Sequence, residues 1–131
     1  MTSDVTMSDK TIHNPAEPRH FMRIKPVAGR VVISRGDEVL ATSDRAVRLI
    51  EVGKDVYDPT IYLPHEDVTA NLTQTNNSTH CPLKGDAIYF DAAEVEEIAW
   101  AYPNPLSIAP ELAGRVAFYG SKVSITETPL D

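Results

Sequence analysis

The chain has 131 residues, of which 42% are apolar, and its formal net charge at pH 7 is −7. This length suits one domain that needs no disulfide or metal for stability, and a single cysteine excludes an intramolecular disulfide. The acidic charge argues against nucleic acid or an anionic membrane as the main partner, and no apolar run approaches the roughly 20 residues of a membrane span.

The N-terminal segment is polar and mixes acidic and basic residues. It contains the pairs Asn14-Pro15 and Glu17-Pro18, which break a helix, and shows no apolar periodicity. It also lacks the apolar core of a secretory signal. We therefore expect residues 1–22 to form a flexible tail, residues 23–128 to form one domain, residues 129–131 to be a C-terminal end, and the protein to be cytoplasmic.

The first part of the domain indicates a hairpin followed by a helix. Two β-rich runs, 31–33 and 39–42, are separated by Gly36-Asp37, which is typical of a hairpin turn. Residues 44–52 then combine a good N-cap, Asp44, with apolar residues at helical spacing and a following glycine. We expect a short amphipathic helix there, with Arg48 and Glu51 three residues apart on its exposed side.

The second half of the domain favours short strands. Residues 68–74 alternate between apolar and polar, 76–78 indicate a turn, and 87–90 is expected to pair back on 68–74. Residues 91–97 fit either one helical turn or strand, because Asp91 and Glu94 have capping-box spacing. We expect a strand over 98–102, a short helix over 109–114 and a final hairpin formed by 116–119 and 123–126. The fold class is therefore mainly β, a compact antiparallel two-sheet or half-barrel domain with one or two short helices.

The stretch from Ser78 to Phe90 is the candidate functional centre, because it holds the only cysteine between His80 and Pro82. A neighbouring cation lowers the pKa of a thiol, so Cys81 with His80 is a candidate catalytic pair. Adjacent residues of a strand point to opposite faces, however, and a free cysteine is most often an inert small apolar residue.

Two further kinds of site are conceivable for the same stretch. Lys84 followed by Gly85 places a charge beside an approachable backbone N–H, which suits a phosphate or carboxylate, and Arg48 could add a bidentate contact. A zinc site needs four ligands at short spacing, and only a scattered set is conceivable, so we expect no metal and no cofactor. The scattered set consists of His65, Asp67, His80 and Cys81.

The aromatic residues are more often core than pocket residues, but Tyr62 and Tyr102 each lie beside a proline-bounded loop and are the better pocket candidates. Several motifs in a fixed order also resemble the domain of unknown function 427 family, which carries a nucleotidyltransferase-type label. The resemblance covers roughly residues 24–127. It is carried by Asp44-Arg45-Ala46 with Leu49 and Glu51, Tyr62-Leu63-Pro64 with Glu66-Asp67-Val68, Thr79-His80-Cys81-Pro82 with Lys84-Gly85, Ala87 and Tyr89, Ala99-Trp100 with Tyr102 and Pro105, and Gly114 with Ala117-Phe118-Tyr119.

This resemblance implies a small bacterial protein with a compact β-rich fold. It directs attention to Glu51, Tyr62, His80, Cys81, Lys84, Trp100 and Tyr102. Two departures concern the pocket wall and one hairpin: Leu83 stands where the family often has an aromatic residue, and the segment after Phe90 is shorter.

We therefore expect the protein to bind a small polar or anionic ligand in a cleft around the His-Cys-Pro-x-Lys-Gly motif. The ligand-binding candidates are Lys84, Gly85, Glu51, Arg48, Tyr62, Trp100 and Tyr102. Two alternatives remain open: an enzyme of nucleotidyltransferase or thiol-dependent group-transfer type that uses the same cleft, and a non-catalytic interaction or oligomerisation module. A homodimer is compatible with each of these expectations.

Overall fold

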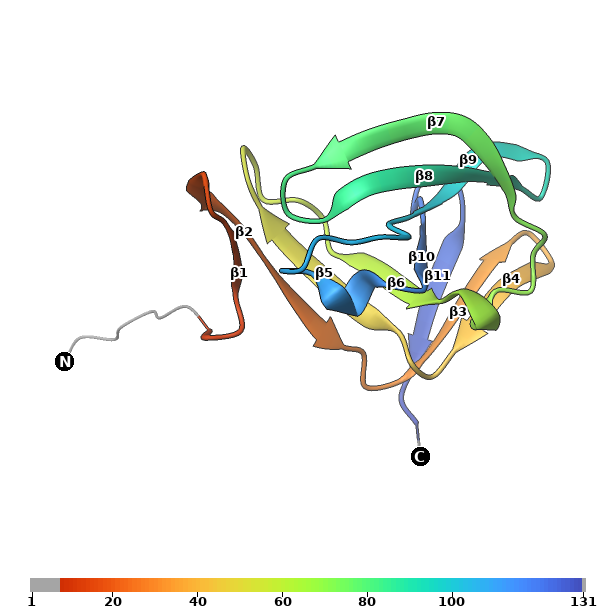
Figure 1. Ribbon diagram of the computed structural model, residues 1–131. Helices are drawn as coiled ribbons and strands as arrows, with labels where there is room; N and C mark the ends of the chain where they lie inside the picture. Colours follow the sequence, from red (N-terminus) through yellow and green to blue (C-terminus); the bar gives the residue numbers. More distant parts are fainter. Residues whose placement is uncertain (1–7, 131) are drawn as a thin grey trace.

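Two antiparallel β-sheets build the protein in the computed structural model, which describes residues 8–130 (Figure 1). The large sheet has eight strands in the order β1-β2-β5-β6-β10-β9-β8-β7, and the small sheet has three in the order β11-β3-β4. This architecture confirms the mainly β, two-sheet expectation. The large sheet comprises β1 (Ile12–Asn14), β2 (Glu17–Pro26), β5 (Val47–Val52), β6 (Thr60–Pro64), β7 (Thr73–Cys81), β8 (Gly85–Ala92), β9 (Val95–Ala101) and β10 (Arg115–Phe118).

The small sheet comprises β3 (Arg30–Arg35), β4 (Glu38–Ser43) and β11 (Ser124–Thr128). Within residues 8–130, the helical content is two single turns of 3₁₀ helix, η1 (His65–Asp67) and η2 (Pro110–Leu112). Neither of these helical turns is long and apolar enough to cross a membrane.

Each face of the large sheet packs against a separate apolar layer, because side chains alternate between the two faces of a strand. Leu63 and Val116 point towards the small sheet and join its residues in one core cluster. Tyr62 and Ala117 point the other way, into a second cluster. The segment between β9 and β10 crosses this second face and contributes Ala109 and Leu112 to it (Figure 1).

Several sequence expectations are confirmed in this fold. The β3–β4 hairpin turns at Gly36, whose φ of 58° lies in the left-handed region that glycine adopts without strain. Strand β9 covers most of the strand expected over 98–102. The strand expected over 68–74 is wrong except at its end, because the strand that pairs with β8 begins at Thr73 and continues to Cys81. The short helix expected over 109–114 is present as the 3₁₀ turn η2.

The helix expected over 44–52 is wrong, because residues 47–52 form strand β5. Its apolar residues also fit a two-residue period: Val47 and Leu49 are buried while Ile50 is exposed. Hydrogen bonding to β2 on one side and β6 on the other selects the strand. Asp44 serves as an ion-pair partner for Arg30 instead of capping a helix.

Other local expectations are corrected by the strand pairing. The turn expected at 76–78 is wrong: these residues stay within β7, where a register shift between Gln74 and Ser78 accommodates them. Of the two alternatives for residues 91–97, strand is the one found: β8 ends at Ala92, β9 begins at Val95, and Ala93 and Glu94 join them with positive φ. The final hairpin is also wrong, because β10 pairs with β6 and β9 whereas β11 pairs with β3.

Strands β1 and β2 occupy much of the segment that we expected to be a tail. Residues 12–14 and 17–22 are β-strand, and β2 continues into the domain and pairs with β5. Residues 1–7 lie outside the described part of the chain. The segment up to residue 22 therefore includes part of the large sheet.

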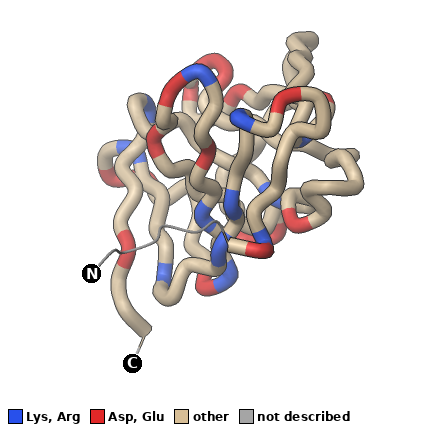
Figure 2. The backbone as a smooth tube through the Cα atoms, turned by 90° about the vertical axis from the view of Figure 1, so that its left-hand side faces the viewer, with Lys and Arg blue, Asp and Glu red and all other residues tan. Residues whose placement is uncertain are grey.

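Figure 2 shows that basic and acidic residues are interspersed along the backbone rather than gathered in separate regions. Several of the arginines in the first half of the chain form ion pairs with carboxylates, for example Arg45 with Asp67 and Arg48 with Glu127. Exposed pairs of this kind each contribute little to stability.

Gly85 at the start of β8 is a position that only glycine fits. Its φ is 111°, and a Cβ there would lie 3.3 Å from the backbone oxygen of Asn104 and 3.4 Å from the nitrogen of Leu106. We predict that Gly85→Ala lowers the free energy of unfolding by about 1–3 kcal/mol, through backbone strain and displacement of the 104–106 segment. Urea denaturation measures this loss.

The control is Gly120→Ala. A methyl group added at Gly120 would meet no atom within 4 Å beyond its chain neighbours, and this glycine lies outside the positive-φ region. A change below about 1 kcal/mol is expected there. Equal effects of the two substitutions would contradict the structural role assigned to Gly85.

Candidate functional site

The turn between β7 and β8 is fixed by its own residues. Pro82 occupies the second position of the turn, where its restricted φ is favourable, and the backbone N–H of Lys84 donates to the oxygen of Cys81 at 3.2 Å. Leu83 is fully buried in the apolar cluster beneath. The turn is therefore anchored inward, and Lys84 follows the anchor directly.

Lys84, Glu51 and His20 form a network that joins three distant segments of the chain. The ammonium of Lys84 lies 2.5 Å from Glu51 Oε1, and His20 Nε2 lies 2.8 Å from Glu51 Oε2. The side chains of Glu51 and Lys84 are 12% and 11% exposed, and that of His20 is 18% exposed. Both oxygens of a largely buried carboxylate are thus hydrogen-bonded, as a buried charge requires.

Two opposing effects act on the pKa of Glu51. Burial alone would raise it, but the hydrogen bonds from Lys84 and His20 outweigh burial and hold the pKa below its ordinary value. Glu51 is therefore ionised at neutral pH. Its negative charge offsets the positive charge of the adjacent ammonium.

The hydrogen bonds of Asn14 indicate which nitrogen of the His20 imidazole carries the proton. The Asn14 side-chain oxygen accepts a hydrogen bond from the N–H of Ala16 at 3.0 Å, so its amide nitrogen is the atom that faces His20 Nδ1 at 3.4 Å. We assign Nδ1 as the acceptor and Nε2–H as the donor to Glu51. Both ring nitrogens are then engaged, and His20 presents ring carbon to the surroundings.

The aromatic candidates lie on the same face of the large sheet as this network. Trp100 Nε1 donates to the hydroxyl of Tyr62 at 3.1 Å, and the ring centroids of Tyr62 and Tyr102 are 6.5 Å apart. The ammonium of Lys84 lies 5.8 Å from the centroid of Tyr102. Burial raises the pKa of Tyr62 and of Tyr102 well above the usual value, so both phenols remain neutral.

Three of the sequence-predicted residues lie apart from this network. His80 is exposed, and its Nδ1 lies 2.8 Å from a carboxylate oxygen of Asp86 rather than near the thiol. Cys81 packs against the apolar cluster, and no hydrogen bond to its sulfur is found within residues 8–130. Arg48 is one residue out of phase with Leu49 and Glu51 on β5 and pairs with Glu127 on the other side of the strand.

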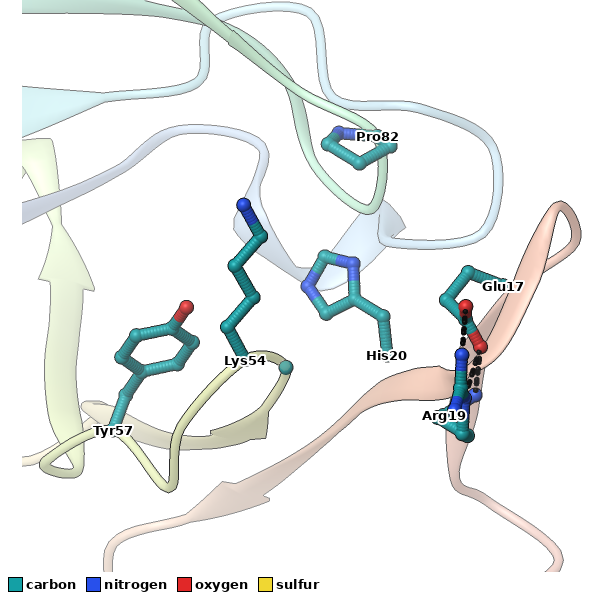
Figure 3. A pocket seen from close by; sticks show the side chains of 7 residues that line it. Glu17, Arg19, His20, Lys54, Tyr57 and Pro82 are labelled. Carbon is teal, nitrogen blue, oxygen red and sulfur yellow. Dashed lines mark hydrogen bonds and ion pairs between the residues drawn. The ribbon is translucent and has the colours of Figure 1, made fainter.

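A pocket of about 730 Å³ opens beside the network (Figure 3). Strand β2 supplies one wall, the β5–β6 loop supplies another, and the β7–β8 turn supplies Pro82. In Figure 3, Lys54 lies between Tyr57 and His20, with Pro82 above them and the Glu17–Arg19 pair to one side. The lining residues are Glu17, Arg19, His20, Gly53, Lys54, Tyr57 and Pro82.

Most of these lining residues were missed from the sequence. Three of them precede residue 23, in the segment assigned to a tail, and three lie in the loop after the supposed helix. A signal for the first group was available, since Met22 and Ile24 alternate with Arg23 and Lys25 as in a half-buried strand. No comparable pattern marks the loop at residues 53–59.

The conceivable metal set of His65, Asp67, His80 and Cys81 does not form a cluster. Within residues 8–130, no group of three or more His, Cys, Asp or Glu side chains is placed to hold a metal ion. The described residues therefore provide no metal centre on which a function could be argued.

The chain belongs to the family described as a domain of unknown function, DUF427, whose model matches residues 23–128. No curated protein matches the sequence. The matched segment contains Glu51, Lys84 and the aromatic cluster, whereas Asn14, His20 and the other residues of β1 and early β2 precede it. The family description states no activity, so function has to be argued from the site.

The lowered pKa of Glu51 predicts how stability depends on pH. The unfolded state takes up a proton near the ordinary pKa of 4.5, while the folded state takes it up only at lower pH. The stabilisation by this carboxylate is therefore complete above pH 4.5 and is lost as the pH falls through the folded-state pKa. We predict that Glu51→Gln is clearly less stable than wild type at pH 7 and that this difference shrinks towards pH 3.

Urea denaturation of both proteins across pH 7 to 3 measures the difference directly. Wild type and variant share every other titratable group, so each serves as the reference for the other. A stability difference that stays constant over this range would contradict the assignment of an ionised, stabilising Glu51.

Proposed function

We propose that the protein binds a small polar or anionic molecule in the pocket between β2, the β5–β6 loop and Pro82. The observation that carries the proposal is a pocket of about 730 Å³ whose wall includes both Pro82 of the His-Cys-Pro-x-Lys-Gly motif and His20 of the buried network. This volume falls within the range of roughly 300–1,000 Å³ that is common for small-molecule sites.

The charge around the pocket favours an anion. Arg19 and Lys54 line it against one carboxylate, Glu17, in a protein whose net charge is −7. Glu17 holds Arg19 through two hydrogen bonds of 2.9 Å. Lys54 is exposed and makes no hydrogen bond or ion pair within residues 8–130, so its ammonium is the cation available to a ligand.

In this proposal Lys84 and Glu51 position the pocket wall instead of contacting the ligand. The ammonium of Lys84 is already engaged by Glu51, and Glu51 in turn orients His20. Gly85 has a structural reason of its own in the close approach of residues 104–106. In this proposal the anion is therefore bound by Lys54, and not by Lys84 as the sequence suggested.

A thiol-dependent group transfer has less support. A reactive cysteine requires a neighbouring cation or base to favour the thiolate. His80, the adjacent candidate base, is hydrogen-bonded to Asp86. Cys81 packs against apolar side chains.

A thermal-shift screen of nucleotides, sugar phosphates and small organic acids tests the proposal. A ligand at ten times its Kd stabilises the folded state by about 1.4 kcal/mol, which raises the Tm of a chain this size by roughly 3–6 °C. We predict that at least one class of anion gives such a shift. Lys54→Gln should reduce it strongly, because this substitution removes the unpaired cation.

Lys25→Gln is the matched control, because it removes the same charge from an exposed position of β2 outside the pocket. Cys81→Ser is a second control, which separates simple binding from a covalent role of the thiol. The proposal is contradicted if no compound stabilises the protein at millimolar concentration, or if Lys54→Gln and Lys25→Gln reduce the shift equally. Loss of the shift in Cys81→Ser would favour the thiol-dependent alternative.

A further inference from the structure

We propose that the ligand of this pocket is an anion that carries a planar, aromatic or heteroaromatic ring, with the ring stacked against Tyr57 and the anionic group at Lys54. This inference rests on the proposed function and specifies the chemical class of the ligand. Its support comes from the packing of two rings against Gly53, from the exposed aromatic ring of Tyr57 and from the position of the cation relative to it.

Gly53 is the residue against which two rings of the pocket wall pack. A methyl group at this position would lie 3.2 Å from Cδ2 of His20 and 3.3 Å from Cε2 of Tyr57. Both rings therefore lie close against the Gly53 backbone, and a side chain here would displace one or both of them. Because the φ of Gly53 lies outside the left-handed region, close packing of the two rings, and not local backbone conformation, is the reason for glycine here.

Tyr57 is presented to solvent by an ordered loop. Its backbone N–H donates to the oxygen of Glu51 at 3.1 Å, the N–H of Gly53 donates to Asp55 at 2.9 Å, and Val52 forms a bridge with Val56. Despite these constraints the Tyr57 residue is 45% exposed. A large aromatic ring held in place at a pocket wall offers a stacking surface for another planar ring.

His20 and Pro82 complete an apolar environment for such a ring. Both nitrogens of His20 are hydrogen-bonded, to Asn14 and Glu51, so the atom that His20 places against Gly53 is a ring carbon. Pro82 adds a rigid aliphatic ring that the buried Leu83 anchors in place. A purely ionic ligand would leave these surfaces uncovered, whereas a planar ring covers them.

Lys54 follows Gly53 directly, so the cation lies next to the residue against which both rings pack. In Figure 3 its side chain extends across the pocket towards Pro82, between the rings of Tyr57 and His20. An anionic substituent on a ring stacked against Tyr57 is therefore within the range of a flexible ammonium. The geometry thus pairs one ring with one anionic group.

Titration calorimetry on the full chain with two matched probes tests this inference. 1-Naphthyl phosphate and cyclohexyl phosphate carry the same anion, but only the first has a planar ring. We predict that wild type binds the naphthyl compound at least about 5-fold more tightly, the preference expected from one aromatic contact. Tyr57→Leu should bring the ratio close to one, and Gly53→Ala should weaken naphthyl binding by displacing the Tyr57 and His20 rings.

Val56→Ala is the control variant, because it removes an exposed apolar side chain from the same loop without lining the pocket. Equal affinity of wild type for the two probes would overturn the planar-ring inference while leaving the anion pocket intact. A naphthyl preference that survives both Tyr57→Leu and Gly53→Ala would overturn its location. Failure of both probes to bind overturns the inference, and the broader ligand screen with Lys54→Gln then decides separately on the proposed function.

Discussion

The carboxylate of Glu51 is the group on which the candidate site depends. It is largely buried on β5, and it receives Lys84 from the β7–β8 turn and His20 from β2. A buried carboxylate is costly unless its oxygens are bonded, so these partners are constrained to stay together. Through them the network connects the N-terminal strands, the centre of the sheet and the edge hairpin that carries Cys81.

His20 of this network lines the pocket, and the other lining residues come from the chain segments next to His20, Glu51 and Lys84. The segment that matches the family model contains Glu51 and Lys84 and supplies the β5–β6 loop and Pro82 to the pocket. The part of β2 before residue 23 supplies His20, Arg19 and Glu17. The pocket is therefore built jointly by the family domain and by a segment outside the match. In the proposed function, ligand binding would draw on both parts.

The sequence predicted the fold class, and the local expectations that failed have identifiable physical causes. The β3–β4 hairpin was predictable because Gly36-Asp37 is a local turn signal. Strand β5 was not, because Ala46, Val47, Leu49 and Ile50 fit a helical period while Val47 and Leu49 also fit a two-residue period. Pairing with β2 and β6 decides between them. The separation of β10 from β11 likewise depends on long-range pairing.

At the site, the motif and the family resemblance singled out Lys84 and Glu51, which lie 33 residues apart and meet in the fold. It gave no information on His20 or Lys54, because their contribution arises only when β2 and the β5–β6 loop come together. The His80–Cys81 pair failed to form a contact for a local reason: adjacent residues of β7 point in opposite directions.

Amide hydrogen exchange of wild type and Glu51→Gln tests the central claim most directly, since Glu51 is held responsible for keeping β1 and the start of β2 docked. The account predicts faster exchange in the variant for residues 12–20, with unchanged protection in the small sheet of β3, β4 and β11. Unchanged exchange over residues 12–20 in Glu51→Gln would contradict it.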